Sequence, residues 1–231
     1  MMTLTRYGLK EWGLATFGAV ATIACCIAIH IIMPRFPVFI LWILIAWAML
    51  FWLCIAGFFR SPKRKLPADK TLILSPADGT VKDIEEVEFT EAPFNGKALR
   101  VGIFLSVFNV HVNRAPAEWS VSSKVYREGE FLDARNPKCI SENEAMTLIG
   151  EGKIDDIKFP MAVRQISGAI AKRIVCPVNP GHKLNRGEIY GMIKFGSRTE
   201  LYLPCNGEFT LQVKIGDKVN GGTSVLAKLN K

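Results

Sequence analysis

Three residues of types that carry enzyme chemistry lie far apart in this sequence. Asp78 lies within residues 75–79, a turn signal that contains proline and glycine. His111 follows a long apolar stretch, and Ser197 follows Gly196. An aspartate, a histidine and a serine that converge in a fold can activate the serine, because the imidazole takes the hydroxyl proton and the carboxylate orients the imidazole. The candidate chemistry is therefore nucleophilic attack by Ser197.

Taken one at a time, these residues also fit structural roles. Asp78 precedes a glycine and suits a turn, and a lone histidine at the end of an apolar run is more often structural than catalytic. Two other enzyme classes use the same residue types. A triad hydrolase would place its serine in a G-x-S-x-G elbow, which Ser197 lacks. A metallopeptidase using His111 and His182 would need ligand spacing on a helix, which is also missing.

The elements that must position these residues are predicted to be mostly strands. Apolar and β-branched residues recur in short runs separated by Gly, Pro, Asn and Asp. This pattern is typical of a sandwich or barrel, so the predicted fold class is mainly β. Residues 141–150 alone are predicted to form a short helix or an ordered loop. The predicted strands cover residues 71–74, 80–89, 98–112, 120–125, 154–163, 170–175, 189–195, 200–203, 208–215 and 224–229.

The C-terminal part of the chain gives a further indication of architecture. Residues 205–209 resemble residues 77–81, and residues 213–222 have the strand, Gly-Asp turn, strand order of lipoyl and biotinyl carrier domains. These features predict a soluble domain like a barrel-sandwich hybrid. The exposed lysine that carriers modify is missing from this stretch, so no lipoyl or biotinyl site is predicted. A non-catalytic, membrane-tethered, lipoyl-like module is an alternative function, and it would stay one intact chain.

The N-terminal part of the chain is predicted to be a membrane segment. Residues 14–33 and 38–59 are apolar runs, each long enough to span about 30 Å of hydrocarbon as a helix. Pro34 and Pro37 between them end one helix and begin the next. The predicted organisation is a two-helix transmembrane hairpin over residues 1–59 followed by a catalytic β domain over residues 60–231.

The charges that flank the hairpin predict its orientation. Arg6 and Lys10 precede it and four basic residues follow it within 60–65, whereas the connecting turn has only Arg35. By the positive-inside bias both ends face the cytoplasm, which predicts an inner-membrane protein with a cytoplasmic catalytic domain. A cleavable signal peptide is the competing interpretation, but a second apolar run follows the first at once. A shallow hairpin that does not cross fully is a further alternative.

The charge and residue composition of the chain limit the classes of partner and ligand that it is expected to bind. The chain of 231 residues has a formal net charge of +8, which suits an anionic membrane surface or a merely basic soluble one. No Arg-rich stripe with interleaved aromatic residues occurs, so nucleic acid is not predicted as a partner. The six cysteines form no C-x-x-C pair and no metal site is predicted. They are expected to be small buried residues in a reducing compartment.

Several segments together resemble one enzyme family. Residues 75–81 resemble its aspartate motif, residues 108–116 its histidine motif and residues 193–204 (IKFGSRTELYLP) its processing segment. Residues 58–62 resemble its junction between membrane segment and domain. The family is that of the phosphatidylserine decarboxylase proenzymes, in its short, membrane-anchored form. The resemblance covers most of residues 57–231.

This resemblance implies that the chain cleaves itself. Ser197 is similar to the family's self-processing serine, whose hydroxyl attacks the carbonyl of Gly196, with His111 as the base and Asp78 as the orienting carboxylate. Cleavage after residue 196 would give a β chain, residues 1–196, and an α chain, residues 197–231. The α chain would begin with a pyruvoyl group derived from Ser197, which is the expected cofactor.

The resemblance also implies the reaction. The pyruvoyl ketone would take up electrons as the serine headgroup of phosphatidylserine loses CO₂, which gives phosphatidylethanolamine. An ether lipid of the archaetidylserine type carries the same headgroup and is an alternative substrate. The expected partners are an anionic phospholipid and the membrane. The two self-cleaved chains are expected to form a heterodimer, which could dimerise further.

Two features depart from the better-known branch of the family. That branch carries Leu-Gly-Ser-Thr at the processing site, where this chain has Phe-Gly-Ser-Arg, and it carries a second histidine where this chain has Phe108. The proton donor for decarboxylation is therefore left open between His111, water and another group, with His182 as a candidate. Arg114 and Arg198 adjoin the motifs and are predicted to bind the carboxylate or phosphate of the substrate.

Overall fold

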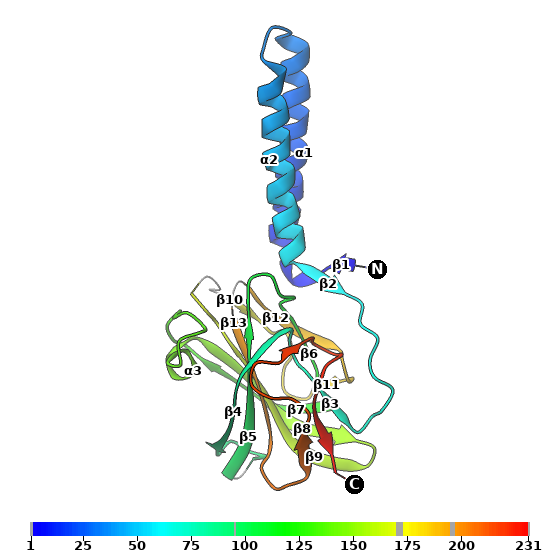
Figure 1. Ribbon diagram of the computed structural model, residues 1–231, viewed down its shortest axis with the longest axis vertical. Coiled ribbons are helices and arrows are strands. Elements are labelled where there is room, and N and C mark those ends of the chain that lie inside the picture. Colours follow the sequence, from blue (N-terminus) through cyan, green and yellow to red (C-terminus); the bar gives the residue numbers. More distant parts are fainter. Residues whose placement is uncertain (1, 95, 170–172, 195–196, 231) are drawn as a thin grey trace. The chain divides into compact units, whose positions relative to one another are not determined.

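The computed structural model describes residues 2–94, 96–169, 173–194 and 197–230. The chain divides into two compact units, Met1–Lys63 and Arg64–Lys231 (Figure 1). The boundary lies a few residues beyond the predicted one at residue 59, because the segment that follows the second helix forms a strand with the N-terminus.

The N-terminal unit is a helical hairpin. Helix α1 spans Leu9–Ile32 and helix α2 spans Val38–Phe58, and both are long and apolar enough to cross a membrane. Strand β1 (Met2–Leu4) pairs antiparallel with β2 (Arg60–Pro62), and a 3₁₀ turn (Arg6–Gly8) leads from β1 into α1. The predicted pair of apolar helices is confirmed. A full crossing of the bilayer stays a prediction.

The two helices run antiparallel and contact each other, and many large apolar side chains on the hairpin are exposed. Trp52 Nε1 donates to Thr16 Oγ1 at 2.8 Å, and the Cys26 thiol lies 3.9 Å from the carbonyl of Leu41. Large side chains such as Phe17 are exposed. Such a surface is unfavourable in water. The unit therefore suits an apolar surrounding.

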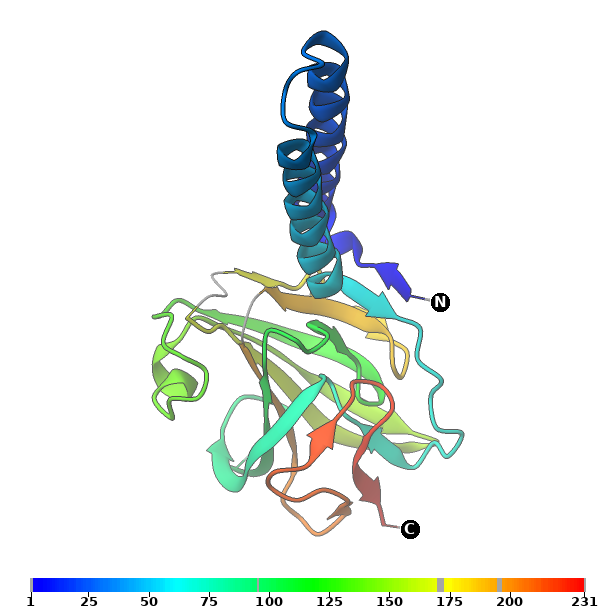
Figure 2. The same cartoon turned by 45° about the horizontal axis from the view of Figure 1, so that its top comes forward.

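The second unit is built on one eight-stranded antiparallel sheet (Figures 1 and 2). In their order across the sheet, the strands are β11 (Lys183–Leu184), β7 (Glu118–Arg127), β8 (Ala145–Ile154), β9 (Ile157–Ile166), β13 (Ser197–Pro204), β5 (Gly96–Leu105), β4 (Gly79–Phe89) and β15 (Lys218–Val219). Strand β13 comes late in the chain, yet it pairs with β9 on one side and β5 on the other. The strand that begins at Ser197 therefore lies inside the sheet.

Two three-stranded sheets complete this unit. One has the order β10 (Arg173–Val175), β12 (Ile189–Lys194) and β6 (Val112–Arg114), and the other has the order β14 (Phe209–Leu211), β16 (Val225–Leu229) and β3 (Leu72–Leu74). A short helix, α3 (Cys139–Glu142), lies in the connection between β7 and β8. The prediction of a mainly β fold is confirmed, and the closer likeness to a barrel-sandwich hybrid stays a prediction.

The large sheet buries side chains on both faces. Leu105 of β5 and Leu201 and Leu203 of β13 belong to the main hydrophobic core. The opposite face carries a smaller cluster that includes Phe89 and Tyr202, whose rings lie 4.8 Å apart. Successive residues of a strand point to opposite faces. Successive side chains of β13 therefore alternate between the face of the main core and the face of the smaller cluster.

The predicted strand over residues 98–112 is wrong in its middle. Strand β5 ends at Leu105 and β6 begins at Val112, and residues 106–109 form a turn between them. The turn is closed by Asn109, whose side-chain oxygen accepts hydrogen bonds from Ser106. Asparagine is a strong turn former, but the apolar residues around it conceal this signal.

Residues 145–166 form a hairpin that the predicted elements miss. Strand β8 occupies most of the stretch 141–150, which was expected to be a short helix or loop, and only the four residues of α3 are helical. Ile154 and Ile157 are paired, so the predicted strand over 154–163 begins at the last residue of β8 and runs through the turn into β9. Asp155 has φ of 51°, as the two-residue hairpin turns require.

All six cysteines are free. The expectation that they are buried is confirmed for Cys26 and Cys139 and is wrong for Cys25 and Cys54, which are exposed. The two exposed thiols lie on the apolar hairpin, where neighbouring hydrophobic side chains are exposed as well.

Candidate active site

Ser197 is the first residue of β13 and faces the main core. Its side chain is fully buried, on the same face as Leu201. Its hydroxyl oxygen has no hydrogen-bond partner among the described residues. A buried hydroxyl without a partner costs about 1–3 kcal/mol, so such a group calls for a functional explanation. The predicted cleavage site also involves Gly196, which lies outside the described residues.

The strand pairing aligns the turn of Asp78 with Ser197. Ser197 pairs with Leu105 of β5, and Thr80 of β4 pairs with the preceding Phe104. Gly79, the residue after Asp78, is therefore in the same row of the sheet as Ser197, with one strand between them. Two strand spacings put the backbones about 10 Å apart.

His111 is brought toward the processing segment by β12. The register of β6 with β12 continues beyond β6, where Ile193 N donates to the carbonyl of His111 at 3.2 Å. Strand β12 ends at Lys194, shortly before Ser197. His111 thus lies beside the end of the strand that leads into the predicted cleavage site, and its side chain is fully buried.

The environment of His111 selects its tautomer. Its Nδ1 lies 2.9 Å from the backbone oxygen of Asn109. A carbonyl oxygen only accepts hydrogen bonds, so Nδ1 carries the proton in the neutral ring. The other ring nitrogen, Nε2, is then the basic atom. This is the arrangement that a general base requires.

A polar network ties the three motifs together inside the unit. Asn113 donates to Thr199 Oγ1 at 3.0 Å and accepts from Gln165 at 2.8 Å. The backbone of Arg114 donates to the carbonyl of Pro76, in the turn of Asp78, at 2.9 Å. The network therefore links β6, β9 and β13 with the turn of Asp78.

Asp78 is buried and held by two donors. Its Oδ2 accepts from Arg64 Nη2 at 2.7 Å, and its Oδ1 accepts from the backbone N–H of Gly221 at 2.7 Å. A Cβ at position 221 would come within 3.3 Å of the Ala77 backbone, so glycine permits this close approach. The predicted role of Asp78 in orienting His111 stays a prediction.

Arg114 lies near the same carboxylate. It is buried, and it donates to the carbonyl of Gly187 at 3.0 Å. Burial lowers the pKa of its guanidinium, the positive charge of Arg64 lowers it further, and the negative charge of Asp78 raises it. Two arginines therefore lie near this buried carboxylate, Arg64 bonded to it and Arg114 within electrostatic reach of it.

Comparison with known proteins explains this constellation. The sequence model of the family described as phosphatidylserine decarboxylase matches residues 51–227. A phosphatidylserine decarboxylase proenzyme of Pelobacter propionicus is 43% identical over 172 residues, which cover 74% of this chain and 75% of that protein. The chain belongs to the phosphatidylserine decarboxylase family. Proteins of the same name from Nitrosomonas europaea and Carboxydothermus hydrogenoformans are 41% and 44% identical, over 80% and 78% of this chain and 83% and 82% of theirs.

The matches confirm the resemblance to the phosphatidylserine decarboxylase proenzymes. The matched region contains the aspartate, histidine and serine motifs, and the protein is an enzyme, a phospholipid-metabolising decarboxylase of a proenzyme family. Two network residues of this decarboxylase were missed. Asn113 lies within the histidine motif and could have been found there. The sequence signal for Gln165 is weaker, because it is only a polar residue on the otherwise apolar, core-facing side of a strand.

Arg198 of this decarboxylase points away from Ser197. Its Nη2 lies 2.6 Å from Asp83 Oδ1 and its Nε lies 2.8 Å from Glu200 Oε1, on the opposite face of the sheet. A Cβ at Gly102 would collide with the guanidinium, which lies close to the backbone of β5 at this glycine. Burial lowers the pKa of Arg198, but the two carboxylates raise it above its ordinary value. This placement favours a structural role, and contact with the substrate stays an untested prediction.

Replacing Arg198 by alanine is expected to destabilise the catalytic unit strongly. Glu200 is fully buried and would lose its closest cation. Breaking one side of a buried pair typically costs about 3–5 kcal/mol. Chemical denaturation of the full chain in detergent measures this change. The control is Arg135→Ala, which breaks an exposed pair with Asp133 and should change stability by less than about 1 kcal/mol. Equal stability of the two variants would contradict the prediction.

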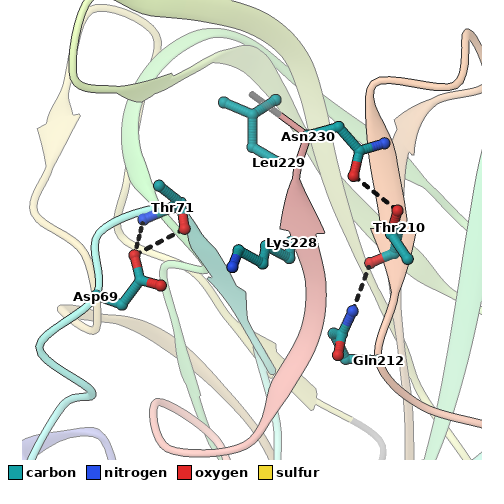
Figure 3. A pocket seen from close by; sticks show the side chains of 7 residues that line it. All are labelled: Asp69, Thr71, Thr210, Gln212, Lys228, Leu229 and Asn230. Atoms are coloured by element: carbon teal, nitrogen blue, oxygen red, sulfur yellow. Dashed lines mark hydrogen bonds between the residues drawn. The ribbon is translucent and has the colours of Figure 1, made fainter.

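Other polar groups of the decarboxylase lie apart from the site. His182 Nδ1 accepts from the backbone of Asn179 within an exposed turn, which fits the structural interpretation of this histidine. An open hollow of about 560 Å³ lies beside β3, β14 and β16 (Figure 3). Its side chains bond to one another, for example Thr210 to Asn230 at 2.7 Å. None of the predicted catalytic residues lines it. The residues that line it are Asp69, Thr71, Thr210, Gln212, Lys228, Leu229 and Asn230.

Proposed function

We propose that this chain cleaves itself between Gly196 and Ser197 and then decarboxylates phosphatidylserine with the pyruvoyl group formed from Ser197. The observation that carries the proposal is the buried hydroxyl of Ser197, which has no hydrogen-bond partner among the described residues. Ser197 begins β13, shortly after β12, whose Ile193 donates to the carbonyl of His111. The proenzyme names of the relatives support it.

The chemistry of cleavage follows from these groups. Nε2 of His111 takes the proton of the Ser197 hydroxyl, and the oxygen attacks the carbonyl carbon of Gly196. The amide becomes an ester as its nitrogen is released and protonated. Loss of the α proton of residue 197 then expels the carboxylate of the 1–196 fragment. Water replaces the remaining nitrogen, which leaves as ammonia, so that residues 197–231 begin with a ketone.

The position of β13 explains how the two chains stay together. After cleavage the α chain would still contribute three strands to four pairings with strands of the β chain: β13 with β5 and β9, β15 with β4, and β16 with β3. These ladders hold the new N-terminus in its place inside the sheet. The expected product is therefore a heterodimer.

In the decarboxylation step the pyruvoyl ketone supplies an electron sink that protein side chains lack. The residues around it bind and orient the lipid headgroup. The guanidinium groups of Arg64 and Arg114 near Asp78 suit the phosphate or the carboxylate. We assign the proton movements of this step to His111 as well. An ether lipid of the archaetidylserine type offers the same headgroup to these residues.

Replacing Arg114 by glutamine is expected to lower kcat/KM for phosphatidylserine while self-cleavage continues. A hydrogen bond to a charged group is worth about 1.5–3 kcal/mol, which corresponds to a loss of about 10- to 150-fold. Cleavage needs no phospholipid and should continue, since Asp78 keeps its bonds to Arg64 and Gly221. Gel analysis measures the cleavage, and CO₂ release measures the activity. An unchanged kcat/KM would exclude Arg114 from substrate binding.

The function itself is tested by CO₂ release from carboxyl-labelled lipids. The full chain in detergent micelles is supplied with phosphatidylserine or an ether-linked serine lipid, each labelled at the serine carboxylate, and the blank contains unlabelled phosphatidylglycerol instead. Release from phosphatidylserine supports the proposal, and release from the ether lipid alone would point to an archaetidylserine-type substrate. A single uncleaved chain without activity on either lipid would favour a non-catalytic module.

We further propose that the protein resides in the inner membrane with its catalytic unit in the cytoplasm. The two apolar helices are compatible with membrane association. Basic residues gather on both sides of the hairpin, as the positive-inside bias requires for cytoplasmic ends. Protease digestion of right-side-out and inverted vesicles tests this orientation.

A further inference from the structure

A rigid apolar turn adjoins the catalytic histidine. Asn109 N donates to the carbonyl of Ser106 at 2.9 Å, and Asn109 Oδ1 accepts from the backbone and the hydroxyl of Ser106. The two residues in the middle of this turn, Val107 and Phe108, are exposed by 39% and 84%. Phe108 is more exposed than any other large hydrophobic side chain among the described residues.

The turn is coupled directly to the site. The carbonyl of Asn109, which closes the turn, is also the group that accepts from Nδ1 of His111. The turn therefore fixes the position of the His111 ring relative to Phe108. A single exposed hydrophobic residue needs no explanation, but one held by four hydrogen bonds next to a catalytic group does.

The segment that contains the turn carries no charged residue. Residues 101–113 contain no Asp, Glu, Lys or Arg. A cavity of about 310 Å³ next to the turn is lined mainly by apolar side chains, and its one charged pair, Asp133 with Arg135, is joined at 2.6 Å. The cavity reaches Leu105, the residue that pairs with Ser197.

An exposed basic side chain lies at the same end of the unit. Arg173 of β10 is exposed, and it pairs across the strands with Lys194, which is buried at the end of β12 next to His111. An apolar tip with a cation behind it suits insertion into an anionic lipid surface.

We propose that the turn of residues 106–109 inserts Val107 and Phe108 into the interfacial region of an anionic bilayer, so that His111 and Ser197 meet the headgroup of a lipid that stays in its leaflet. The proposal rests on the proposed function and identifies the form in which the site takes its substrate. The occupant of this surface is the bilayer.

The first test compares two substrates of the variant Phe108→Ser. The full chain is reconstituted in vesicles of phosphatidylcholine and phosphatidylglycerol, with long-chain phosphatidylserine in the bilayer or with monomeric dihexanoyl phosphatidylserine in solution. Loss of one inserted aromatic side chain should lower kcat/KM for the bilayer substrate by about 10-fold or more. Self-cleavage and turnover of the monomeric substrate should stay within about 2-fold, since neither needs insertion.

The matched control is Ile157→Ser. Ile157 is also an exposed hydrophobic residue, at the start of β9. The other end of this strand, Ile166, pairs with Arg198, the neighbour of Ser197. Ile157 is therefore about 30 Å from that end along the strand. It should leave both activities unchanged. Equal losses with both substrates in Phe108→Ser would mean that the turn only holds His111, and no loss with either would also overturn the proposal. If the wild-type protein releases CO₂ from neither substrate, the proposed function fails instead.

A second measurement does not depend on activity. Phe108→Trp and Ile157→Trp are placed in vesicles that contain brominated lipids, which quench tryptophan fluorescence at short range. The added quenching, relative to the wild-type chain, should occur for Phe108→Trp and not for Ile157→Trp. A blue-shifted emission without lipid quenching would instead place the turn against protein, such as a second copy of the chain, and would overturn the proposal.

Discussion

Replacement of Ser197 by alanine is expected to leave one uncleaved chain of 25.7 kDa that releases no CO₂ from phosphatidylserine. The hydroxyl is the only nucleophile that the proposed cleavage uses, and the same atom becomes the oxygen of the ester that is eliminated. Removing it should abolish cleavage and decarboxylation together. Because the hydroxyl is buried without a described partner, the substitution should not cost stability, and denaturation curves should match or exceed those of the wild type.

The matched control for this variant is Ser167→Ala. Ser167 is equally buried and its hydroxyl donates to the carbonyl of Glu144 at 3.2 Å. This variant should lose about 1 kcal/mol of stability and should still cleave and turn over. Cleavage in Ser197→Ala, followed by gel electrophoresis over days, would show that another residue is the nucleophile.

Replacement of His111 by alanine is expected to slow self-cleavage by about 10²- to 10⁴-fold, the usual contribution of a general base. The tautomer fixed by Asn109 leaves Nε2 as the proton acceptor, and no other histidine of the catalytic unit occupies this region, since His182 belongs to an exposed turn. The measurement is the rate at which newly synthesised full-length chain is converted to two fragments.

His182→Ala is the control and should cleave at the wild-type rate. In His111→Ala that has cleaved slowly to completion, CO₂ release tells whether the same histidine also moves protons in decarboxylation. Activity at the wild-type level would assign that second role to another group. A wild-type rate of cleavage in His111→Ala would exclude it as the base.

The order of the motifs was predictable, but their convergence was not. Asp78, His111 and Ser197 are recognisable from the residues around them. Their arrangement depends on the position of β13 between β5 and β9. The segments of β5 and β13 lie about a hundred residues apart in the sequence, and no local pattern encodes such a pairing. The partners of Asp78 are likewise remote, because Gly221 lies near the other end of the chain.

Some errors had a signal that local rules could have used. Ser197 and Arg198 are neighbours in a strand, so they must face opposite sides of the sheet. The assignment of both to one site therefore required an irregular strand, and β13 pairs regularly over its whole length. The turn at residues 106–109 was concealed because Val107 and Phe108 suit a strand by composition. Their exposure becomes visible only when the bonds of Asn109 are known.

The intact mass of the purified protein tests self-processing most directly. The proposed chemistry predicts two chains, residues 1–196 and 197–231, the smaller of which is lighter by one ammonia than a peptide of the same residues beginning with serine. A single chain with the full mass of 25.7 kDa, unchanged after long incubation, would contradict self-cleavage and the pyruvoyl group together.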